Sequence, residues 1–289
     1  MAAVGNQNVL VRLKEIRNSL TPVSKRLADY ILKNAAEIPN LSIKSLAQKS
    51  HTSDAAVMRF CKSIGFNGYR NLIVSISTAL GAMDESRANH QFRDINPGDD
   101  LRSIVENISN ANWESIINTL SMLDIKQLEK AVALLCAAER VAFCGLGASG
   151  LVAMDAQQKF MRINKISAAL TDGHSQLTGA VLLGEKDAAV LLSNSGETLD
   201  ILDAVHELKK ASVPIVAITR YGKSSLASCA DVVLPISTPE LKIRSAAMGS
   251  RIAMLNLIDI LYAGVVSRDY ANVQEYLLRT GQALTVKRR

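Results

Sequence analysis

Three hydroxyl-bearing residues lie around a single glycine near the middle of the chain: Ser193, Ser195 and Thr198 flank Gly196. An apolar run precedes this stretch, and apolar residues at helical spacing follow it. The first backbone N–H groups of a helix lack intrahelical partners, and the helix dipole favours negative charge there. Hydroxyl donors at such a helix start are typical of a phosphate site, and glycine lets a ligand approach the main chain. We therefore predict that this turn binds a phosphoryl group.

Two other interpretations compete with a phosphate site. Serine and threonine are common helix N-caps, so these hydroxyls could have a purely structural role. A second turn, Gly145–Gly150, matches the G-x-G-x-x-G pattern of dinucleotide-binding proteins, and Asp172 follows the next strand at the place of a ribose-binding acid. A dinucleotide site would leave the hydroxyl-rich turn unexplained, and no His–Asp or Tyr–Lys pair for hydride transfer stands out. We therefore expect no cofactor.

The elements that position these turns follow from the pattern after residue 140. Short apolar strands alternate with helices, which indicates a five-stranded parallel sheet covered on both faces, a three-layer α/β domain. The expected strands span residues 141–144, 166–170, 188–192, 215–219 and 232–235, and the expected helices span 150–163, 176–183, 198–210 and 224–229. Ligands on such sheets bind at the carboxyl ends of the strands. Both turns lie there, so we expect them to face one site.

Purely helical patterns flank this α/β segment. Before it, helices are expected over residues 8–20, 22–34, 43–49, 54–64 and 69–80, and then over 101–122 and 126–138. After it, a long apolar helix is expected over 245–266 and a last helix over 270–284. Residues 81–100 have few apolar anchors, and we interpret them as a linker. The predicted organisation is a domain over 1–80, a linker over 81–100 and a domain over 101–289.

Charge divides the chain in the same way. Residues 1–80 contain 11 Lys and Arg against 4 Asp and Glu, whereas residues 81–289 contain 22 against 23. The net charge of +6 therefore comes from the first 80 residues, which indicates that only this part meets a polyanion. A solvated basic surface is the alternative.

Two short helices joined by the turn Ser50-His51-Thr52, inside a basic helical bundle, form a helix-turn-helix pattern. The alternative is a plain helical bundle. In a helix-turn-helix, the helix over 54–64 would enter the major groove of DNA. Its outward face is predicted to carry Ser53, Asp54, Ala55, Ala56, Arg59 and Lys62, with Tyr69 and Arg70 holding the phosphate backbone. Asp54 could also cap the start of this helix by accepting backbone N–H groups rather than contact a cytosine base.

Composition excludes several other classes. No uninterrupted apolar run approaches the roughly 20 residues that cross a bilayer, and the N-terminus lacks the pattern of a signal peptide. The four cysteines, at positions 61, 136, 144 and 229, show no metal-type spacing. We therefore expect a cytoplasmic protein with reduced thiols, no metal and no membrane contact.

Residues 140–235 resemble the sugar isomerase (SIS) domain, through Gly145-Leu146-Gly147-Ala148-Ser149 and Ser193-Asn194-Ser195-Gly196-Glu197-Thr198. The first 80 residues resemble the helix-turn-helix of RpiR-type transcription regulators. That resemblance rests on Ser45-Leu46-Ala47, Val57-Met58-Arg59-Phe60-Cys61-Lys62 and Gly65-Phe66-Asn67-Gly68-Tyr69. Ser250-Arg251-Ile252 and Leu257-Ile258-Asp259 are also similar to this family. Together the two resemblances cover nearly the whole chain.

The resemblance implies a DNA-binding regulator whose SIS domain senses a phosphorylated sugar. It implies an effector site made of Gly147, Ser149, Ser193, Asn194, Ser195, Gly196 and Thr198. Glu240, Lys242 and Arg244 fall in the segment that brings polar groups to the sugar in SIS isomerases, and we include Glu240 and Arg244 in the predicted site. A solvated loop is the alternative for that segment.

Two functions remain to be separated. The first is a regulator of carbohydrate metabolism genes that binds double-stranded operator DNA as a homodimer or tetramer. The second is an aldose–ketose isomerase with an appended DNA-binding domain. Isomerisation needs a base near the sugar, and Glu240 is the one credible candidate in the sequence. We therefore expect a regulator without catalytic residues.

Overall fold

The computed structural model describes residues 8–84, 98–237 and 247–285. Contacts divide the chain into an N-terminal unit, which comprises residues up to Asn110 with Leu120–Met122, and a C-terminal unit, which comprises Ala111–Thr119 and the chain from Leu123 onward. Helix α6 (Leu101–Met122) therefore contributes residues to both units. Of the predicted linker, residues 81–84 extend the preceding helix and 98–100 lead into α6, while 85–97 lie outside the described residues.

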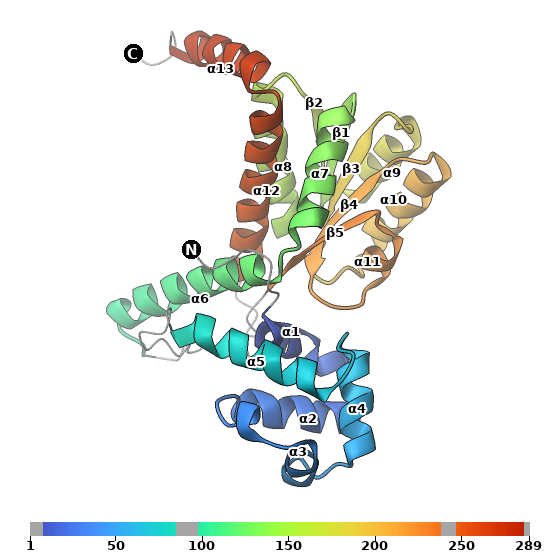
Figure 1. Ribbon diagram of the computed structural model, residues 1–289. Helices are drawn as coiled ribbons and strands as arrows, with labels where there is room; N and C mark the ends of the chain where they lie inside the picture. The colour runs from blue at the N-terminus through green and yellow to red at the C-terminus, as the bar shows by residue number, and fades with distance from the viewer. Residues whose placement is uncertain (1–7, 85–97, 238–246, 286–289) are drawn as a thin grey trace. The chain divides into compact units, whose positions relative to one another are not determined.

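The N-terminal unit contains the expected helices (Figure 1). They are α1 (Val9–Ile16), α2 (Pro22–Lys33), α3 (Ile43–Lys49), α4 (Asp54–Ser63) and α5 (Tyr69–Asp84). The first ends earlier than predicted: the chain tightens into a 3₁₀ turn over Arg17–Ser19 and becomes extended at Leu20. The core of the N-terminal unit is aliphatic around one aromatic ring. Its buried residues include Leu13, Leu27, Ile31, Leu46, Val57, Phe60, Leu72 and Ile76.

Main-chain and hydroxyl hydrogen bonds close the turn between α3 and α4. The Thr52 N–H donates to Ala47 O over 2.8 Å, and the buried Ser50 hydroxyl donates to Leu46 O over 2.6 Å. His51 lies between them with a φ of 52°, in the left-handed region that glycine adopts most readily. The turn thus fixes the angle between α3 and α4 without a glycine.

The C-terminal unit is built on a five-stranded parallel sheet with strand order β2-β1-β3-β4-β5. The strands are β1 (Arg140–Gly145), β2 (Ile166–Leu170), β3 (Ala188–Leu192), β4 (Ile215–Arg220) and β5 (Val232–Ile236), and each lies within two residues of its predicted range. The strand β3 is buried along its whole length, as expected for the centre of a sheet covered on both faces.

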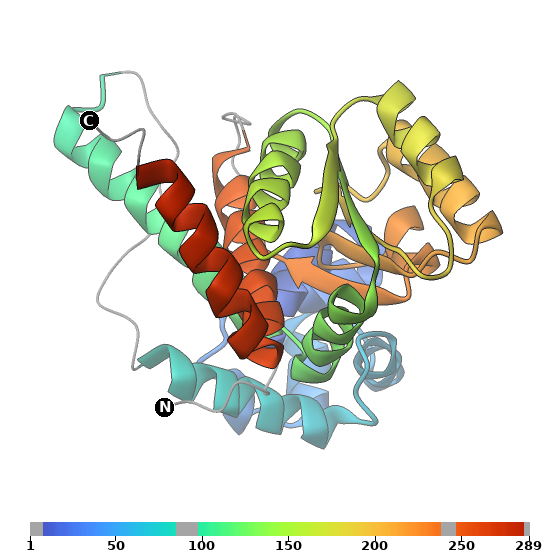
Figure 2. The ribbon, with the colours of Figure 1, turned by 90° about the horizontal axis from the view of Figure 1, so that it is seen from above.

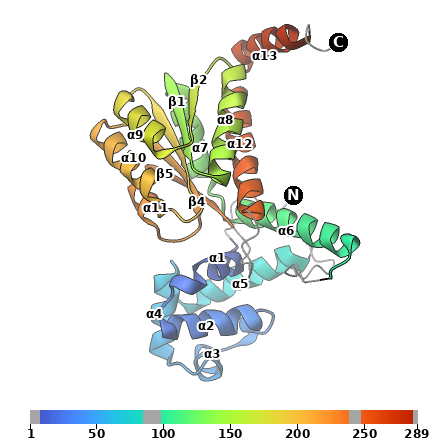
Figure 3. The ribbon, with the colours of Figure 1, turned by 180° about the vertical axis from the view of Figure 1, so that it is seen from behind.

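Helices cover both faces of this sheet (Figures 1 and 2). One face carries α7 (Ile125–Ala137), α8 (Ala148–Arg162) and α12 (Met248–Arg268). The other carries α9 (Gly173–Leu182), α10 (Leu199–Lys210) and α11 (Ser225–Cys229), which lie together when the unit is seen from behind (Figure 3). The last helix is α13 (Tyr270–Thr285). The three-layer α/β prediction is confirmed.

Helix α12 is the described helix that could cross a membrane by length and composition alone. It instead packs on α7 and α8 and buries residues at helical spacing, among them Met254, Leu257, Ile258 and Leu261. Asp259 also forms a 2.5 Å ion pair with Lys159 of α8. These contacts make α12 a core helix of the C-terminal unit.

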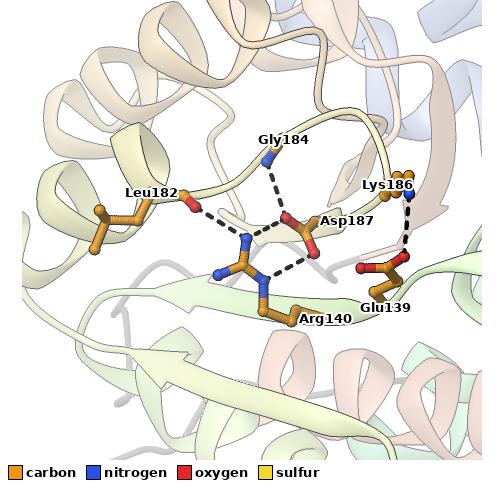
Figure 4. Close-up of polar contacts among 6 residues, drawn as sticks. All are labelled: Glu139, Arg140, Leu182, Gly184, Lys186 and Asp187. Atoms are coloured by element: carbon orange, nitrogen blue, oxygen red, sulfur yellow. Dashed lines mark hydrogen bonds and ion pairs between the residues drawn. The ribbon is translucent and has the colours of Figure 1, made fainter.

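At the end of the sheet where the strands begin, Arg140 and Asp187 form a two-pronged ion pair (Figure 4). Asp187, just before β3, accepts hydrogen bonds from Arg140 Nε and Nη2 at 3.0 and 2.6 Å. It also accepts the Gly184 N–H, and Arg140 donates to Leu182 O. The Arg140 guanidinium lowers the pKa of the Asp187 carboxyl, whose side chain is 4% exposed. This cluster joins β1 to the loop that precedes β3. The two turns lie at the opposite end of these strands.

Candidate functional site

The two predicted turns leave neighbouring strands at the point where the strand order reverses. Gly145, the last residue of β1, is the register partner of Leu192, the last residue of β3. The helix after β1 (α8) covers one face of the sheet, and the helix after β3 (α10) covers the other. Ligands of open α/β sheets bind in the crevice at such a switch point. The fold therefore brings the turns predicted from sequence to one edge.

The first turn is tight and leads directly into α8. A Cβ at Gly145 would lie 2.5 Å from Ser149 O, so no larger residue fits there without a shift of the backbone. Gly147 has a φ of 53° and is the N-cap of α8. From α9, the buried Gln176 side chain donates to Gly145 O and Leu170 O over 3.3 and 3.0 Å. Ser149 is half-buried in the first turn of α8.

Hydrogen bonds within the second turn hold its shape. The buried Ser193 Oγ lies 2.9 Å from Thr198 Oγ1 and accepts the Gly196 N–H over 3.1 Å. The Glu197 N–H donates to Ser195 Oγ over 3.2 Å, while the Ser195 side chain is exposed. Gly196 has a φ of 68°, which disfavours any other residue. The hydroxyl of Ser195 thus keeps its own hydrogen available at the open edge.

Helices α8 and α10 both begin without a side-chain cap at this edge. Gly147 has no side chain to cap α8, and among the described residues the Thr198 side chain accepts no hydrogen bond from an N–H of α10. Other helices of the same unit are capped, by Asp124 for α7, Asp172 for α9 and Ser224 for α11. Helix α12 also lacks a cap, but the residues before Ala247 lie outside the described range. Uncapped helix starts are typical anion sites, so the starts of α8 and α10, which follow adjacent strands, are candidates for binding a phosphate.

A second row of polar groups lies behind the second turn. Thr219, at the end of β4, is fully buried, and its hydroxyl has no partner among the described residues. The Asn194 side-chain oxygen is also buried without a partner there, while the Asn194 main-chain oxygen accepts the Arg220 N–H over 3.1 Å. A Cβ on Gly196 would lie 2.6 Å from Ser224 Cβ and 2.9 Å from Thr219 Oγ1. Sequence patterns alone did not reveal Thr219 and Ser224, because β4 is distant in sequence.

The structure gives Asp172, the acidic residue of the dinucleotide interpretation, a structural role. Asp172 is the N-cap of α9, in a capping box with Ser175, and hydrogen bonds from Ser175 lower its pKa. Helix α9 consequently begins at Gly173, earlier than the predicted start at Gln176. Its neighbour His174 is exposed. No group of three or more His, Cys, Asp or Glu side chains suited to a metal occurs among the described residues.

The predicted sugar-contacting residues Glu240 and Arg244, together with Lys242, lie outside the described residues. The structure therefore leaves their placement as a prediction. Their segment follows β5, whose end is at the same edge as the two turns, because Arg220 of β4 is the register partner of Ile236.

In the N-terminal unit, α4 presents most of the predicted DNA-contacting residues. Ser53, Ala55, Arg59 and Lys62 are exposed, and Asp54 is partly exposed in the first turn. Ala56 differs from the prediction: it is 7% exposed, because it lies on the inward side of the first turn beside Val57. Ser53 caps α4 through the Ala56 N–H.

Tyr69 and Arg70 occupy different environments at the start of α5. Arg70 is exposed, whereas the Tyr69 hydroxyl donates to Leu41 O over 2.9 Å, and burial raises the pKa of Tyr69 to about 12. Arg12 of α1 contacts the C-terminal end of α4: its Nη2 donates to Ile64 O over 3.0 Å, and its guanidinium lies 5.9 Å from the Phe66 ring centre. These contacts hold the segment between α4 and α5 in place.

Comparison with known proteins gives a family match in each unit. Residues 134–264 match the SIS domain, and residues 7–82 match the helix-turn-helix domain of the rpiR family. The chain is 37% identical to an HTH-type transcriptional regulator of Caldanaerobacter subterraneus subsp. tengcongensis, with 97% of this chain and 98% of the relative covered. It is 35% identical to the HTH-type transcriptional regulator YbbH of Bacillus subtilis, with 95% and 96% covered.

A solved structure resembles the chain across both units. The Vibrio vulnificus NanR protein, complexed with ManNAc-6P, is 26% identical, with a TM-score of 0.60 and coverage of 96% of this chain and 98% of that chain. An rpiR-type helix-turn-helix, a SIS domain and regulators as full-length relatives occur in the order that the sequence predicted. The chain therefore belongs to the RpiR family of helix-turn-helix transcriptional regulators with a SIS domain.

Proposed function

We propose that this protein regulates carbohydrate metabolism genes in the cytoplasm and that a sugar phosphate controls its binding to operator DNA. The observation that carries the proposal is the pair of helix starts, of α8 and α10, that lack a side-chain cap at the switch point of the sheet. A phosphate dianion supplies the acceptors that these main-chain groups lack.

The effector's phosphate binds the loop over 193–198. The start of α10 and the Ser195 hydroxyl donate to its oxygens, with Gly147 and Ser149 approaching from α8. Ser193 and Asn194 shape the loop, and Glu240 and Arg244 contact the sugar. The nature of the sugar is suggested by one relative: NanR binds ManNAc-6P, so aminosugar 6-phosphates are the first class to test.

On the DNA side, α4 lies in the major groove of the operator. Arg59 contacts a guanine edge or a phosphate, and Lys62 and Arg70 contact the backbone. The protein acts as a homodimer or tetramer, because two copies of α4 match two half-sites about one helical turn apart.

A run of hydrogen bonds supports a route from the effector loop to α6. The Arg220 N–H donates to Asn194 O, the Tyr221 N–H donates to Ile236 O, and the Ser237 N–H donates to Thr119 Oγ1 over 3.0 Å. Thr119 is fully buried on α6, the helix that contributes to both units. An effector that prefers one position of this edge would thereby change the DNA-binding state.

A screen of sugar phosphates by thermal shift tests the proposal. A ligand that binds the folded state raises the melting temperature, by an amount that grows with its concentration over Kd. We expect an aminosugar or hexose 6-phosphate to raise the melting temperature of the wild-type protein and to leave that of Ser195→Asp unchanged. A panel in which no sugar phosphate stabilises the wild-type chain would contradict the sensor function.

Isomerase activity is the second candidate, because some relatives are enzymes. A base for proton transfer would have to come from Glu240, since His174 and His206 are both exposed on helices of the described structure. We expect no interconversion of aldose and ketose phosphates by the purified protein. Turnover that disappears in Glu240→Gln would replace the regulator-only proposal.

A further inference from the structure

The loop over 193–198 contains a carboxylate, which is unexpected where a phosphate dianion is to bind. Glu197 lies between Gly196 and Thr198, and like charges at close range repel. The structure shows where this charge is directed. Glu197 Oε1 accepts the N–H of Ser225, the first residue of α11, over 2.8 Å. Hydrogen bonds from the side chain and then the backbone of Ser225 lower the pKa of Glu197, so the group is ionised at neutral pH.

The neighbouring residue makes the same connection through its main chain. Gly196 O accepts the Leu226 N–H over 3.0 Å. Two consecutive loop residues thus accept hydrogen bonds from two consecutive residues of α11. Gly196 also packs against Ser224, the N-cap of α11, where no Cβ could fit. The back of the loop is therefore docked on the start of α11 by two hydrogen bonds and a close backbone approach.

Glu197 also joins the back of the loop to its front. Its carboxylate is held by Ser225, while its own N–H donates to Ser195 Oγ over 3.2 Å. A rotation of the Glu197 peptide would consequently shift Ser195, whose side chain is exposed at the edge that we propose for the phosphate. The carboxylate is thus in a position to fix the main-chain orientation of the phosphate loop.

We propose that Glu197 is a positioning residue, which clamps the phosphate loop onto α11 through Ser225 and is not itself a ligand of the effector. This inference rests on the proposed function of the loop. It gives the negative charge a role: the carboxylate accepts the donors of α11, so the loop keeps its own donors directed to the phosphate. It also assigns α11 an indirect part in effector binding, through the loop that it holds.

The clamp can be broken from either side. Glu197→Ala removes the acceptor. Ser225→Pro removes the donor at the first position of a helix, where proline is tolerated, and the preceding Ser224 is extended (φ −150°, ψ 162°), as a residue before proline prefers. Ser225→Ala keeps the N–H and removes only the hydroxyl, so its comparison with Ser225→Pro separates the two donors of Ser225. Glu207→Ala, on α10, controls for the loss of one negative charge.

Binding of inorganic phosphate, measured by titration calorimetry, gives the first readout. We expect Glu197→Ala and Ser225→Pro each to weaken binding about three- to tenfold, the range for losing one typical intramolecular hydrogen bond. The double variant should bind no more weakly than either single variant, because the same contact is lost. Glu197→Gln, which keeps an acceptor oxygen, should restore most of the affinity. Glu207→Ala should bind like the wild type, and Ser225→Ala should bind more tightly than Ser225→Pro, because it keeps the N–H.

A second readout follows the clamp itself. In Ser225→Pro, the carboxyl pKa of Glu197, followed by NMR, should rise toward its ordinary value. Wild-type affinity in both Glu197→Ala and Ser225→Pro would overturn the inference. So would weak binding by Glu197→Gln together with normal binding by Ser225→Pro, because the carboxylate would then act on the ligand directly. A wild-type chain that binds neither inorganic phosphate nor any sugar phosphate would overturn this inference and the proposed function together.

Discussion

Four helices in the N-terminal unit, α1 to α4, begin on side-chain caps, whereas two helices at the switch point of the C-terminal unit do not. Asn8, Thr21, Ser42 and Ser53 each accept a hydrogen bond from the start of α1, α2, α3 and α4, in that order. At the carboxyl ends of the strands, Gly147 and Thr198 provide no such side-chain cap to α8 and α10 within the described residues. An unfilled helix start costs stability unless water or a ligand supplies the acceptor.

On the proposed function, the difference separates two ways of recognising an anion. The N-terminal unit would offer DNA the exposed side chains of α4, Arg59 and Lys62. The C-terminal unit would offer main-chain groups and short hydroxyls at the carboxyl ends of the strands. A long DNA backbone suits long cationic side chains, whereas a single phosphate suits donors that converge on one point.

The largest effect is expected from Gly196→Ala. Its Cβ would lie within 2.6 Å of Ser224 Cβ, at a φ of 68°, so the loop must leave α11. We expect loss of phosphate binding and of about 2–4 kcal/mol of stability, as for overpacking combined with backbone strain. Gly147→Ala is the control for stability: it also has positive φ, but a Cβ there meets nothing within 4 Å. Urea unfolding compares the two variants, and equal losses of stability would contradict the steric explanation.

Ser195→Asp tests whether the open edge recognises an anion. The side chain is exposed, so the fold should tolerate the change. The carboxylate introduced at position 195 would lie beside the negatively charged phosphate of the effector. It should weaken effector binding by about 100-fold or more, since like charges in contact cost several kcal/mol. Operator binding in the absence of effector should persist, as measured by fluorescence anisotropy. Retention of effector binding by this variant would place the phosphate elsewhere.

Arg59→Ala tests the other half of the comparison. Loss of this exposed side chain should weaken operator binding by about 1–3 kcal/mol and leave the effector-induced thermal shift unchanged. If Arg59 contacts a phosphate, the slope of log affinity against log salt should fall by about one. Lys126→Ala, on α7 of the C-terminal unit, removes the same charge as a control. Normal operator binding by Arg59→Ala at physiological salt would show that α4 is not placed in the groove as we propose.

The ion pair between Arg140 and Asp187 gives a prediction for pH. The Arg140 guanidinium lowers the pKa of Asp187 in the folded state, so this carboxyl stabilises the fold fully above its unfolded pKa of about 4. That contribution is lost as the pH falls through the lower folded value. Asp187→Asn should cost about 1–2 kcal/mol at pH 7 and flatten the decline in stability below pH 4. Unfolding curves that depend on pH equally in both proteins would argue against the ion pair.

The smallest effects compare the two kinds of helix start directly. Ser42→Ala should remove about 1 kcal/mol of stability from the N-terminal unit and leave phosphate binding unchanged, because Ser42 caps α3. Thr198→Ala should cost less stability, since Thr198 caps no N–H of α10, but should weaken phosphate binding. Denaturant melts and calorimetry on both variants give the comparison. A reversed pattern would mean that α10 depends on Thr198 as an ordinary cap.

Much of the fold was predictable because local pattern and tertiary structure agree. The five strands alternate with amphipathic helices, and β2 and β3 have their predicted bounds. Thr21-Pro22 marks the start of α2 as expected. Errors occurred where one side chain changed an end or a face: Asp172 starts α9 early, and Ala56 lies inward although its neighbour Ala55 is exposed. Helical spacing alone does not show which of two adjacent alanines faces the core.

The sequence by itself determined the types of donor: a hydroxyl-rich turn after one apolar strand, a glycine-rich turn after another, and a basic helical segment before both. Strand order, however, is a property of long-range pairing, and only the tertiary structure placed Gly145 beside Leu192 and so brought the two turns together. The same pairing decided which hydroxyls are exposed in the loop over 193–198 and which lie buried behind it. Thr219 and Ser224 meet Gly196 only because β4 pairs with β3, a contact that no local spacing encodes.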